Sequence, residues 1–200
     1  MSLTDLKNKK PERFRSILQA AVRVFARKGF YHARVSEIAR EAGVADGTIY
    51  LYFENKDDIL IRLFEEGMTQ VIENVRHEIE KSDDPLEQIK RFAYAHLSLI
   101  ERDKDMAEII QVELRQSSKF MKEYRNEKFY EYLNLVSGII RDGQARGLIR
   151  RDVEPGIFKR AFFGALDEMS RFWVLSSKRK YSINVAAEQI SDFFIKGIAA

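Results

Sequence analysis

The stretch EAGVADGTIYLYFENKDDIL, residues 41–60, holds two short helical patterns separated by a tight turn. The first pattern stops at Gly43, and the second starts almost at once, at Asp46. The second pattern carries Tyr50, Leu51, Tyr52 and Phe53 in a row. A small core covers only one face of so short a helix, so these side chains are more than it can bury. The stretch therefore predicts a helical face that is reserved for another molecule.

We interpret a helix over 35–42, the turn and a helix over 46–53 as a helix-turn-helix. Val44, Ile49 and Phe53 are expected to point to the core, since the last two are one helical turn apart. Five outward residues remain, with Tyr52 on the flank: Asp46, Gly47, Thr48, Tyr50 and Leu51. Such a tip can enter a major groove, and its hydroxyl groups can donate to phosphate oxygens. The alternative is a helical hairpin whose tyrosines only cap a core.

Basic residues are concentrated at the amino-terminal end of the chain. Residues 1–56 hold 11 Lys and Arg against 6 Asp and Glu, whereas the remaining residues hold 23 against 25. Lys56 begins the next helix, where its charge and the free N–H groups both favour an anion. A basic end on a near-neutral body suits a head that binds double-stranded DNA. A solvated basic face is the other interpretation.

Composition restricts the classes of protein that remain. The chain has 200 residues, of which 45% are hydrophobic and 32% charged, and it has no cysteine. Disulfides, thiolate metal sites and cysteine nucleophiles are therefore excluded. No apolar run approaches the ~18 residues of a membrane helix, and the first residues carry no apolar signal core. We expect a cytoplasmic protein without a membrane partner.

Apolar spacing is helical throughout, with no convincing strand, so the expected fold class is all-α. Pro85 follows Asp84 at a predicted helix start, Pro11 is expected to precede the first helix, and glycines such as Gly29 end others. Nine helices are predicted, over 12–29, 35–42, 46–53, 56–81, 84–101, 104–117, 119–146, 155–177 and 183–198. The predicted domains are a helix-turn-helix domain over 1–55 and a ligand-binding and dimerisation domain over 56–200.

The head resembles a known family in ILQAAVRVFARKGF and VSEIAREAGVADGTIYLYFENKDDIL. These residues are similar to the DNA-binding head of TetR-family transcriptional repressors. The matching positions are Ile17, Ala20, Ala21, Phe25, Gly29, Phe30, Ile38, Ala39, Ala42, Gly43, Val44, Gly47, Thr48, Tyr50, Tyr52, Phe53 and Lys56. The resemblance implies a nine-helix TetR-type fold, a homodimer with two heads on one operator, and a ligand pocket in the larger half.

This chain departs from the common family pattern at several positions of the head. Ala33 and Arg34 stand where many members have Thr or Ser, so Arg34 or Ser36 is expected to supply the phosphate contact. Ala45 stands where many have Ser, so Asp46 is expected to cap the recognition helix. Phe14 stands where an arginine is common.

The larger half is similar to a narrower group, the TetR-type FadR repressors of fatty-acid degradation. The resemblance rests on GVADGTIYLYF, on VELRQSS (112–118) and on FGALDEMSRFWV (163–174), with their spacing kept. It implies release from DNA by a long-chain acyl-CoA. The other hypotheses are a TetR-type repressor of another hydrophobic ligand, as in drug-efflux control, and a helical adaptor that binds no DNA.

The predicted ligand site combines apolar residues with a charged pair. Glu113 and Arg115 interrupt an apolar helix, and a buried charge needs a partner such as Asp167. A structural ion pair would explain the same pattern. The candidate ligand-binding residues are Phe92, Leu99, Met106, Ile110, Gln111, Arg115, Phe129, Leu133, Phe163, Asp167 and Trp173. Candidate head-group contacts, which solvated surface would explain equally, are Arg91, Lys119, Lys122 and Arg125.

The last two predicted helices carry more apolar surface than one protomer face needs. We predict a two-fold four-helix bundle between protomers. Its candidate residues are Phe158, Phe162, Ala165, Phe172, Ile190, Phe193 and Phe194. Alternatively, these helices close the protomer's own core. The helix over 56–81, fused to the head, is the expected lever between effector and DNA.

An enzyme is the main competing class, and the sequence gives it little support. The three histidines, His32, His77 and His96, are scattered over separate predicted helices. Glu73 and His77 are four residues apart, but the local pattern is that of a solvated helix face. No catalytic motif or nucleotide fingerprint appears. We therefore predict no catalytic residue, no metal and no cofactor.

Overall fold

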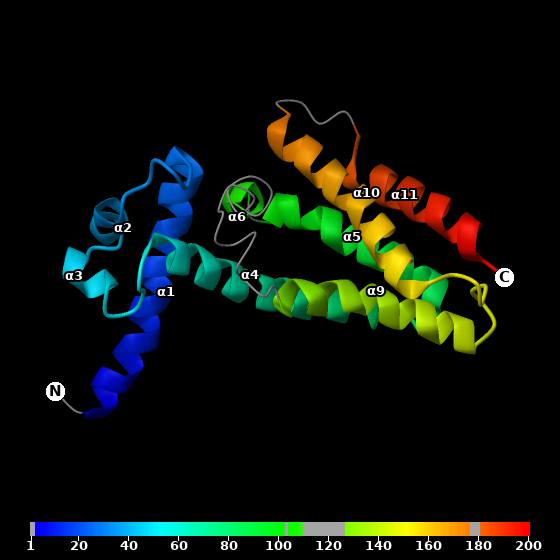
Figure 1. Ribbon diagram of the computed structural model, residues 1–200, viewed down its shortest axis with the longest axis horizontal. Helices are drawn as coiled ribbons and strands as arrows, with labels where there is room; N and C mark the ends of the chain where they lie inside the picture. Colours follow the sequence, from blue (N-terminus) through cyan, green and yellow to red (C-terminus); the bar gives the residue numbers. More distant parts are fainter. Residues whose placement is uncertain (1–2, 103, 110–126, 177–180) are drawn as a thin grey trace. The chain divides into compact units, whose positions relative to one another are not determined.

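The structure is a computed structural model that describes residues 3–102, 104–109, 127–176 and 181–200 (Figure 1). Regular structure in these ranges is helical, apart from one isolated antiparallel bridge between Ile149 and Ala199. The helices of these ranges are α1 Leu3–Lys28, α2 Val35–Glu41, α3 Asp46–Ile49, α4 Lys56–Ile79, α5 Pro85–Arg102, α6 Lys104–Glu108, α9 Glu127–Ala145, α10 Pro155–Leu175 and α11 Ile183–Ile198. The all-α expectation is confirmed.

The described chain forms two compact units. The first contains residues up to Gly67 and the short segment 105–109, and the second contains residues from Met68 to Lys104 and from 127 onward. α4 contributes its first half to the first unit and its second half to the second. The predicted functional boundary at residue 55 stays a prediction.

Two helix boundaries differ from expectation by four residues or more. α1 begins at Leu3, so Pro11 lies inside this helix instead of before it. A proline removes one backbone donor and disfavours the helix interior, which is why the sequence suggested a later start. α3 ends at Ile49, because the next residues form a turn in which Leu51 N donates to Thr48 O (3.2 Å) and Tyr52 N to Ile49 O (3.0 Å).

The predicted helix ends have the expected local chemistry. Gly29, Gly43 and Gly147 adopt positive φ angles of 75°, 68° and 72°, the left-handed conformation that closes a helix. Pro85 is the first residue of α5, and Leu86 N donates to Asp84 Oδ1 over 3.0 Å. These short-range signals set most of the boundaries.

In the second unit, α5 packs against α9, α10 and α11 (Figure 1). Phe162 of α10 is fully buried, with its ring centroid 6.0 Å from Phe92 and 5.0 Å from Phe194. Phe158 is also buried, and its centroid is 5.6 Å from that of Phe194. Phe158 and Phe162 therefore belong to the protomer's own core, and their predicted place in a dimer interface is corrected.

The packing of α9 on the 148–150 segment gives a first testable prediction. A Cβ added at Gly143 would clash with Ile149 Cδ1 and would lie 2.7 Å from Ile149 Cγ1, and Ile149 is buried. We expect Gly143→Ala to lower the free energy of unfolding by about 1–3 kcal/mol through overpacking. The measurement is urea denaturation followed by helical circular dichroism.

Gly138 of the same helix provides the matched control. It is exposed, and a Cβ there would meet nothing within 4 Å. Gly138→Ala is expected to stabilise the protein by about 0.5–1 kcal/mol through helix propensity. Equal effects at the two glycines would contradict the packing argument.

Candidate nucleic-acid interface and effector region

The turn after α2 gives the first unit its helix-turn-helix shape. Gly43 ends α2 in the left-handed conformation, and Val44 N donates to Ala39 O over 3.0 Å. Ile49 and Phe53 are buried, as predicted. Tyr50 and Leu51 lie between them and expose 59% and 76% of their surface. The turn thus places a polar aromatic and an aliphatic side chain in solvent next to a fixed core.

The other predicted DNA contacts of this tip differ in exposure. Thr48 and Tyr52 are half-buried, and the Tyr52 ring lies beside Phe14, with 6.5 Å between centroids. Phe14 itself stacks on Phe53 at 5.2 Å, so it serves the core at a position where the family often has arginine. Besides Tyr50 and Leu51, the exposed members of the predicted set are Arg34, Ser36, Ala45, Asp46 and Gly47.

The start of α3 differs from the predicted cap. Ala45 is the N-cap residue and makes no side-chain hydrogen bond, while Asp46 is already the first helical residue. Asp46 therefore acts through its charge at the positive end of the helix and does not cap it. The expected capping role of Asp46 is corrected.

Several basic side chains of the first unit are already paired with α2. Glu41 accepts from Arg23 Nε at 2.8 Å and pairs with Arg27 at 3.4 Å, and Glu37 pairs with Lys28. The hydrogen bond from Lys28 is the main cause of the lowered pKa of Glu37, and that from Arg23 of the lowered pKa of Glu41. The head's excess positive charge is therefore partly neutralised on the α1 side.

Arg34 and Arg40 differ from these paired residues. Both are exposed, and neither forms an ion pair within the part of the chain that the structure describes. Glu37 Oε2 instead accepts a hydrogen bond from the backbone N–H of Arg34 at 3.1 Å, which fixes the start of α2. Arg34 thus keeps its guanidinium group available for a phosphate.

Lys56 lies differently from the prediction. Its ammonium group donates to the carbonyl oxygens of Phe30, Tyr31 and Ala33 at 2.7, 3.1 and 3.0 Å. An ammonium group has three N–H bonds, so all of its donors are used inside the protein. Burial lowers the pKa of Lys56. The predicted phosphate contact by this side chain therefore does not fit the structure.

The predicted effector residues do not all lie together. Some are buried in the second unit, some are half-buried there, and one belongs to the first unit. Phe92, Leu133 and Trp173 are buried, whereas Leu99, Phe129, Phe163 and Asp167 are half-buried. Met106 belongs to the first unit, where its Sδ would lie 3.5 Å from a Cβ added at Gly67. Three candidate ligand-binding residues, Ile110, Gln111 and Arg115, lie outside the described residues, as do Glu113, Lys119, Lys122 and Arg125.

Buried and half-buried aromatic residues of the second unit lie around a polar pair that the sequence did not reveal. His96 Nδ1 and the Tyr132 hydroxyl are 2.7 Å apart, and both residues are buried. Phe163 contacts both rings, at centroid distances of 5.5 and 6.3 Å, and also lies 5.0 Å from Phe129. Phe92, Phe129 and Phe163 of the predicted site thus form one cluster with this pair.

The electrostatics of this pair follow from its burial. Burial lowers the pKa of His96 from 6.5 to about 4, against the opposing effect of the Asp167 carboxylate. Burial, supported by Asp167, raises the pKa of the Tyr132 hydroxyl. Both groups are therefore neutral near pH 7. The charge of Asp167 acts on both, so the predicted polar residue of α10 does lie near this cluster.

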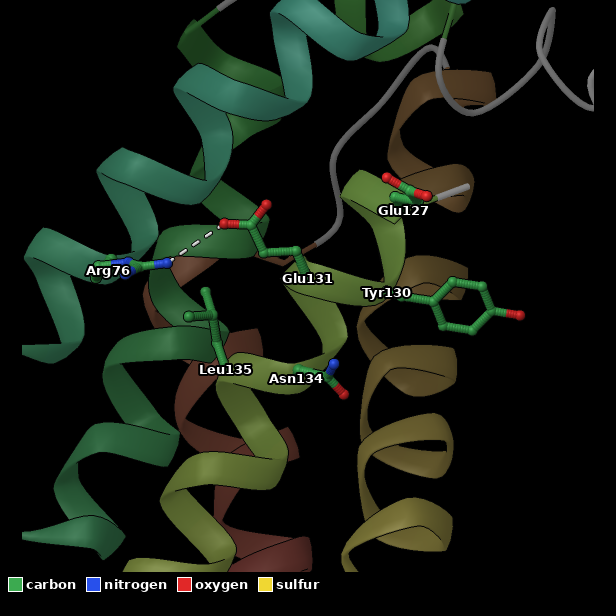
Figure 2. A pocket seen from close by; sticks show the side chains of 6 residues that line it. All are labelled: Arg76, Glu127, Tyr130, Glu131, Asn134 and Leu135. Carbon is green, nitrogen blue, oxygen red and sulfur yellow. Dashed lines mark hydrogen bonds and ion pairs between the residues drawn. The ribbon is translucent and has the colours of Figure 1, made fainter. Parts of the chain in front are cut away.

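A pocket of about 510 Å³ lies elsewhere in the second unit, between α4 and α9 (Figure 2). It is lined by Arg76, Glu127, Tyr130, Glu131, Asn134 and Leu135. Arg76 points toward Glu131, with 3.5 Å between their charged atoms (Figure 2). None of the predicted ligand residues is among the lining residues, and only Leu135 is aliphatic. The pocket does not match the expected site for an acyl chain.

Arg91, a candidate head-group contact, is already engaged by carboxylates. Its guanidinium group lies 3.1 Å from Glu78 and 3.2 Å from Glu87. Glu78 also pairs with Lys81, so removing Arg91 would leave Glu78 with one cation instead of two and would take from Glu87 the cation that pairs with it. Arg91 is therefore a structural residue in this conformation.

One face of α10 and α11 is apolar and exposed. Phe193 exposes 70% of its surface, and Phe172 is also exposed. The large exposed hydrophobic residues of these helices are Ile157, Phe172, Leu175, Val185 and Phe193. The other predicted interface residues, Ala165, Ile190 and Phe194, are half-buried. Five large exposed apolar side chains on two neighbouring helices are typical of an interaction surface.

Two other kinds of site are absent from the described ranges. No group of three or more His, Cys, Asp or Glu residues there is placed to hold a metal ion. No helix there is both long enough and apolar enough to span a bilayer.

Comparisons with known proteins agree with this geometry. The family model for bacterial regulatory proteins of the tetR family matches residues 17–63, and that for the C-terminal region of YsiA-like proteins matches residues 64–197. The fatty acid metabolism regulator protein of Bacillus subtilis (strain 168) is 37% identical over 193 residues, 96% of this chain and 98% of that protein. The chain belongs to the TetR family of bacterial transcriptional regulators.

Solved structures support the same assignment. The transcriptional regulator FadR from Bacillus subtilis, in complex with stearoyl-CoA, matches with a TM-score of 0.84 at 37% identity, covering 92% of this chain and 99% of that one. The fatty acid degradation regulator FadR from Bacillus halodurans matches with a TM-score of 0.82 at 34% identity, covering 92% and 98%. The resemblance to FadR repressors drawn from the sequence is confirmed, and these relatives are regulators of transcription.

Proposed function

We propose that this protein is a transcriptional repressor that binds a palindromic operator as a homodimer and is released by a long-chain acyl-CoA. The genes under its control would be those of fatty-acid degradation, and it would act in the cytoplasm. The observation that carries the proposal is the relationship, along nearly the whole chain, to a regulator solved with stearoyl-CoA.

DNA binding is supported by the tip of the first unit. Tyr50 and Leu51 are exposed beside a buried Ile49 and Phe53, so the tip is held rigidly while its polar and apolar groups face solvent. A helix start of small residues, Asp46 and Gly47, fits the width of a major groove. Arg34 supplies a positive charge at the start of α2 for the phosphate backbone.

Dimerisation is supported by the exposed apolar face of α10 and α11. Two copies joined through this face would form a four-helix bundle and set two recognition helices one DNA turn apart, or a multiple of it. Light scattering after size-exclusion chromatography should give twice the protomer mass of 23.4 kDa. A mass of one protomer at micromolar concentration would contradict this part of the proposal.

A long acyl chain supplies enough free energy to operate a switch. Each buried methylene contributes ~0.8 kcal/mol, so a sixteen-carbon chain contributes roughly 12 kcal/mol before its ordering cost. Moving a conformational equilibrium from 1:99 to 99:1 needs about 5.5 kcal/mol of preference for one state. α4 contributes residues to both units, so it is the element that we propose carries the change to the head.

The test begins with the operator, which the protein itself can select from a random pool of duplex DNA. We expect the selected duplexes to be palindromic and to bind with an affinity that falls steeply with salt. Stearoyl-CoA should release the selected duplex, whereas coenzyme A alone and stearate should not. Binding that is insensitive to stearoyl-CoA would indicate another hydrophobic effector, and failure to enrich any duplex would favour the adaptor hypothesis.

Replacing Tyr50 tests the tip directly. Tyr50→Ala should weaken binding to the selected duplex about ten-fold or more, since a hydrogen bond to a charged group contributes about 1.5–3 kcal/mol. Its melting temperature should stay unchanged because the side chain is exposed. Tyr94→Ala, at an exposed tyrosine of α5, is the matched control and should bind DNA normally. Equal affinity of the two variants in a gel-shift titration would refute the proposal that the tip at Tyr50 binds DNA.

A further inference from the structure

The segment between α1 and α2 is tied to the start of α4 by one side chain. Lys56 Nζ lies 2.7 Å from Phe30 O, 3.1 Å from Tyr31 O and 3.0 Å from Ala33 O, across 23 to 26 positions of sequence. It also lies 4.6 Å from the centroid of the Phe30 ring. Three carbonyl dipoles that point at one place repel one another unless a cation or a donor occupies that place. The ammonium group fills this role.

Both ends of this tie are fixed to the rest of the first unit. At the α4 end, Asp58 N donates to Asn55 Oδ1 at 2.9 Å, and Glu54 N donates to Asp58 Oδ2 at 3.0 Å. On the other side, Phe30 is buried with its ring 5.5 Å from that of Phe25. The position of Lys56 is therefore determined by the helix cap, and it determines the path of the segment that it holds.

That segment leads directly into the residue best placed to meet phosphate. Ala33 is buried and immediately precedes Arg34, the N-cap of α2, whose guanidinium group is exposed. Moving Lys56 Nζ onto a phosphate would break three charge-assisted hydrogen bonds and release Ala33. A phosphate contact by Lys56 would thus be made at the expense of the geometry of Arg34.

We propose that Lys56 is a positioning residue of the DNA-binding head, which holds the 30–33 segment, and through it Arg34 and the start of α2, in the conformation that receives DNA. The proposal rests on the DNA binding proposed above. Lys56 then keeps its three hydrogen bonds to backbone carbonyl oxygens both in the free protein and in the DNA complex, and Arg34 makes the phosphate contact.

Substitution by arginine separates positioning from a phosphate contact. Arginine binds phosphate at least as well as lysine, but its planar fork does not converge on three carbonyls as an ammonium group does. We expect Lys56→Arg to bind the selected duplex about ten-fold more weakly or worse, as after loss of a hydrogen bond to a charged group. Amide exchange at residues 30–35 should accelerate in the DNA-free variant. Wild-type affinity with unchanged exchange would overturn the proposal.

Arg34→Met is the comparison variant, since Arg34 makes no ion pair within the part of the chain that is described. It should leave amide exchange of the free protein unchanged and lower the salt slope of DNA binding by about one unit. If Lys56→Arg gave faster exchange but bound DNA normally, Lys56 would be structural only, and the positioning role would be wrong.

A measurement on the unaltered protein covers the case in which the variants do not fold. The NMR signal of the Lys56 ammonium group should be visible in the free protein, protected by its three acceptors, and should keep its shift in the DNA complex. A coupling to phosphorus in the complex would overturn the proposal. If no duplex is bound at all, the proposed function fails, and amide exchange in the free protein still decides whether Lys56 holds the segment.

Discussion

Replacing Phe162 by alanine is expected to lower the free energy of unfolding by about 3–5 kcal/mol, the range for a large aromatic side chain removed from a packed core. Phe162 is fully buried, and its ring meets Phe92, Phe158 and Phe194 at centroid distances of 6.0, 5.6 and 5.0 Å. Three helices of the second unit would lose contacts at once. Urea denaturation monitored by circular dichroism measures the change.

Phe193→Ala is the matched control, because it removes the same side chain from the neighbouring helix α11. Phe193 is 70% exposed, so its loss should leave the protomer folded with unchanged helical content. If the exposed face joins two copies, Phe193→Ala should weaken the dimer. The molar mass measured by light scattering should then fall toward that of one protomer on dilution. Both variants need the same protein concentration, since the stability of a dimer depends on it.

The opposite pattern would place Phe162 at the surface. If Phe162→Ala dissociated the dimer while the protomer kept its stability, the packing described for α10 would be wrong. The pair of variants therefore tests which aromatic face of α10 and α11 belongs to the core and which is free for a partner.

The sequence predicted those features of the fold that have a local steric cause. Gly43 and Gly147 had to follow helices because few other residues adopt a positive φ without strain, and both do so. Pro85 had to begin a helix because it lacks an N–H group, and α5 begins there. The tip at Tyr50 was predicted because two adjacent faces of one helical turn cannot both be buried.

Features that depend on distant contacts could not be predicted in this way. α10 carries aromatic residues on several faces, so periodicity alone did not separate the buried Phe162 from the exposed Phe172. Lys56 looked like a phosphate ligand because nothing local shows that three carbonyls more than twenty residues earlier converge on it. His96 looked isolated because its partner, Tyr132, lies 36 positions away on α9.

The buried His96 makes the stability of the second unit depend on pH. Burial holds its pKa at about 4 in the folded protein, whereas an exposed histidine titrates near 6.5. Between these values the unfolded chain takes up a proton that the folded protein does not, so acid favours unfolding. The contribution is fully present above pH 6.5 and is lost as the pH falls to 4. Over that range the loss amounts to about 3 kcal/mol, at about 1.4 kcal/mol per pH unit.

A double substitution isolates this contribution. His96→Phe with Tyr132→Phe removes both partners of the 2.7 Å contact, so no buried hydroxyl is left without a partner. The difference in unfolding free energy between the unaltered protein and this variant should shrink toward acid by about 3 kcal/mol between pH 6.5 and 4. It should be constant from pH 6.5 up to the range near pH 10 where an exposed tyrosine ionises. His77→Gln, at an exposed position of α4, should leave the profile unaltered.

Carboxylates with lowered pKa, such as Glu37 and Glu78, are common to all these proteins and cancel in the difference. Parallel profiles for the double variant and the unaltered protein would mean that His96 accepts a proton in the folded state, and that it is not buried against the rings of Phe92, Tyr132 and Phe163.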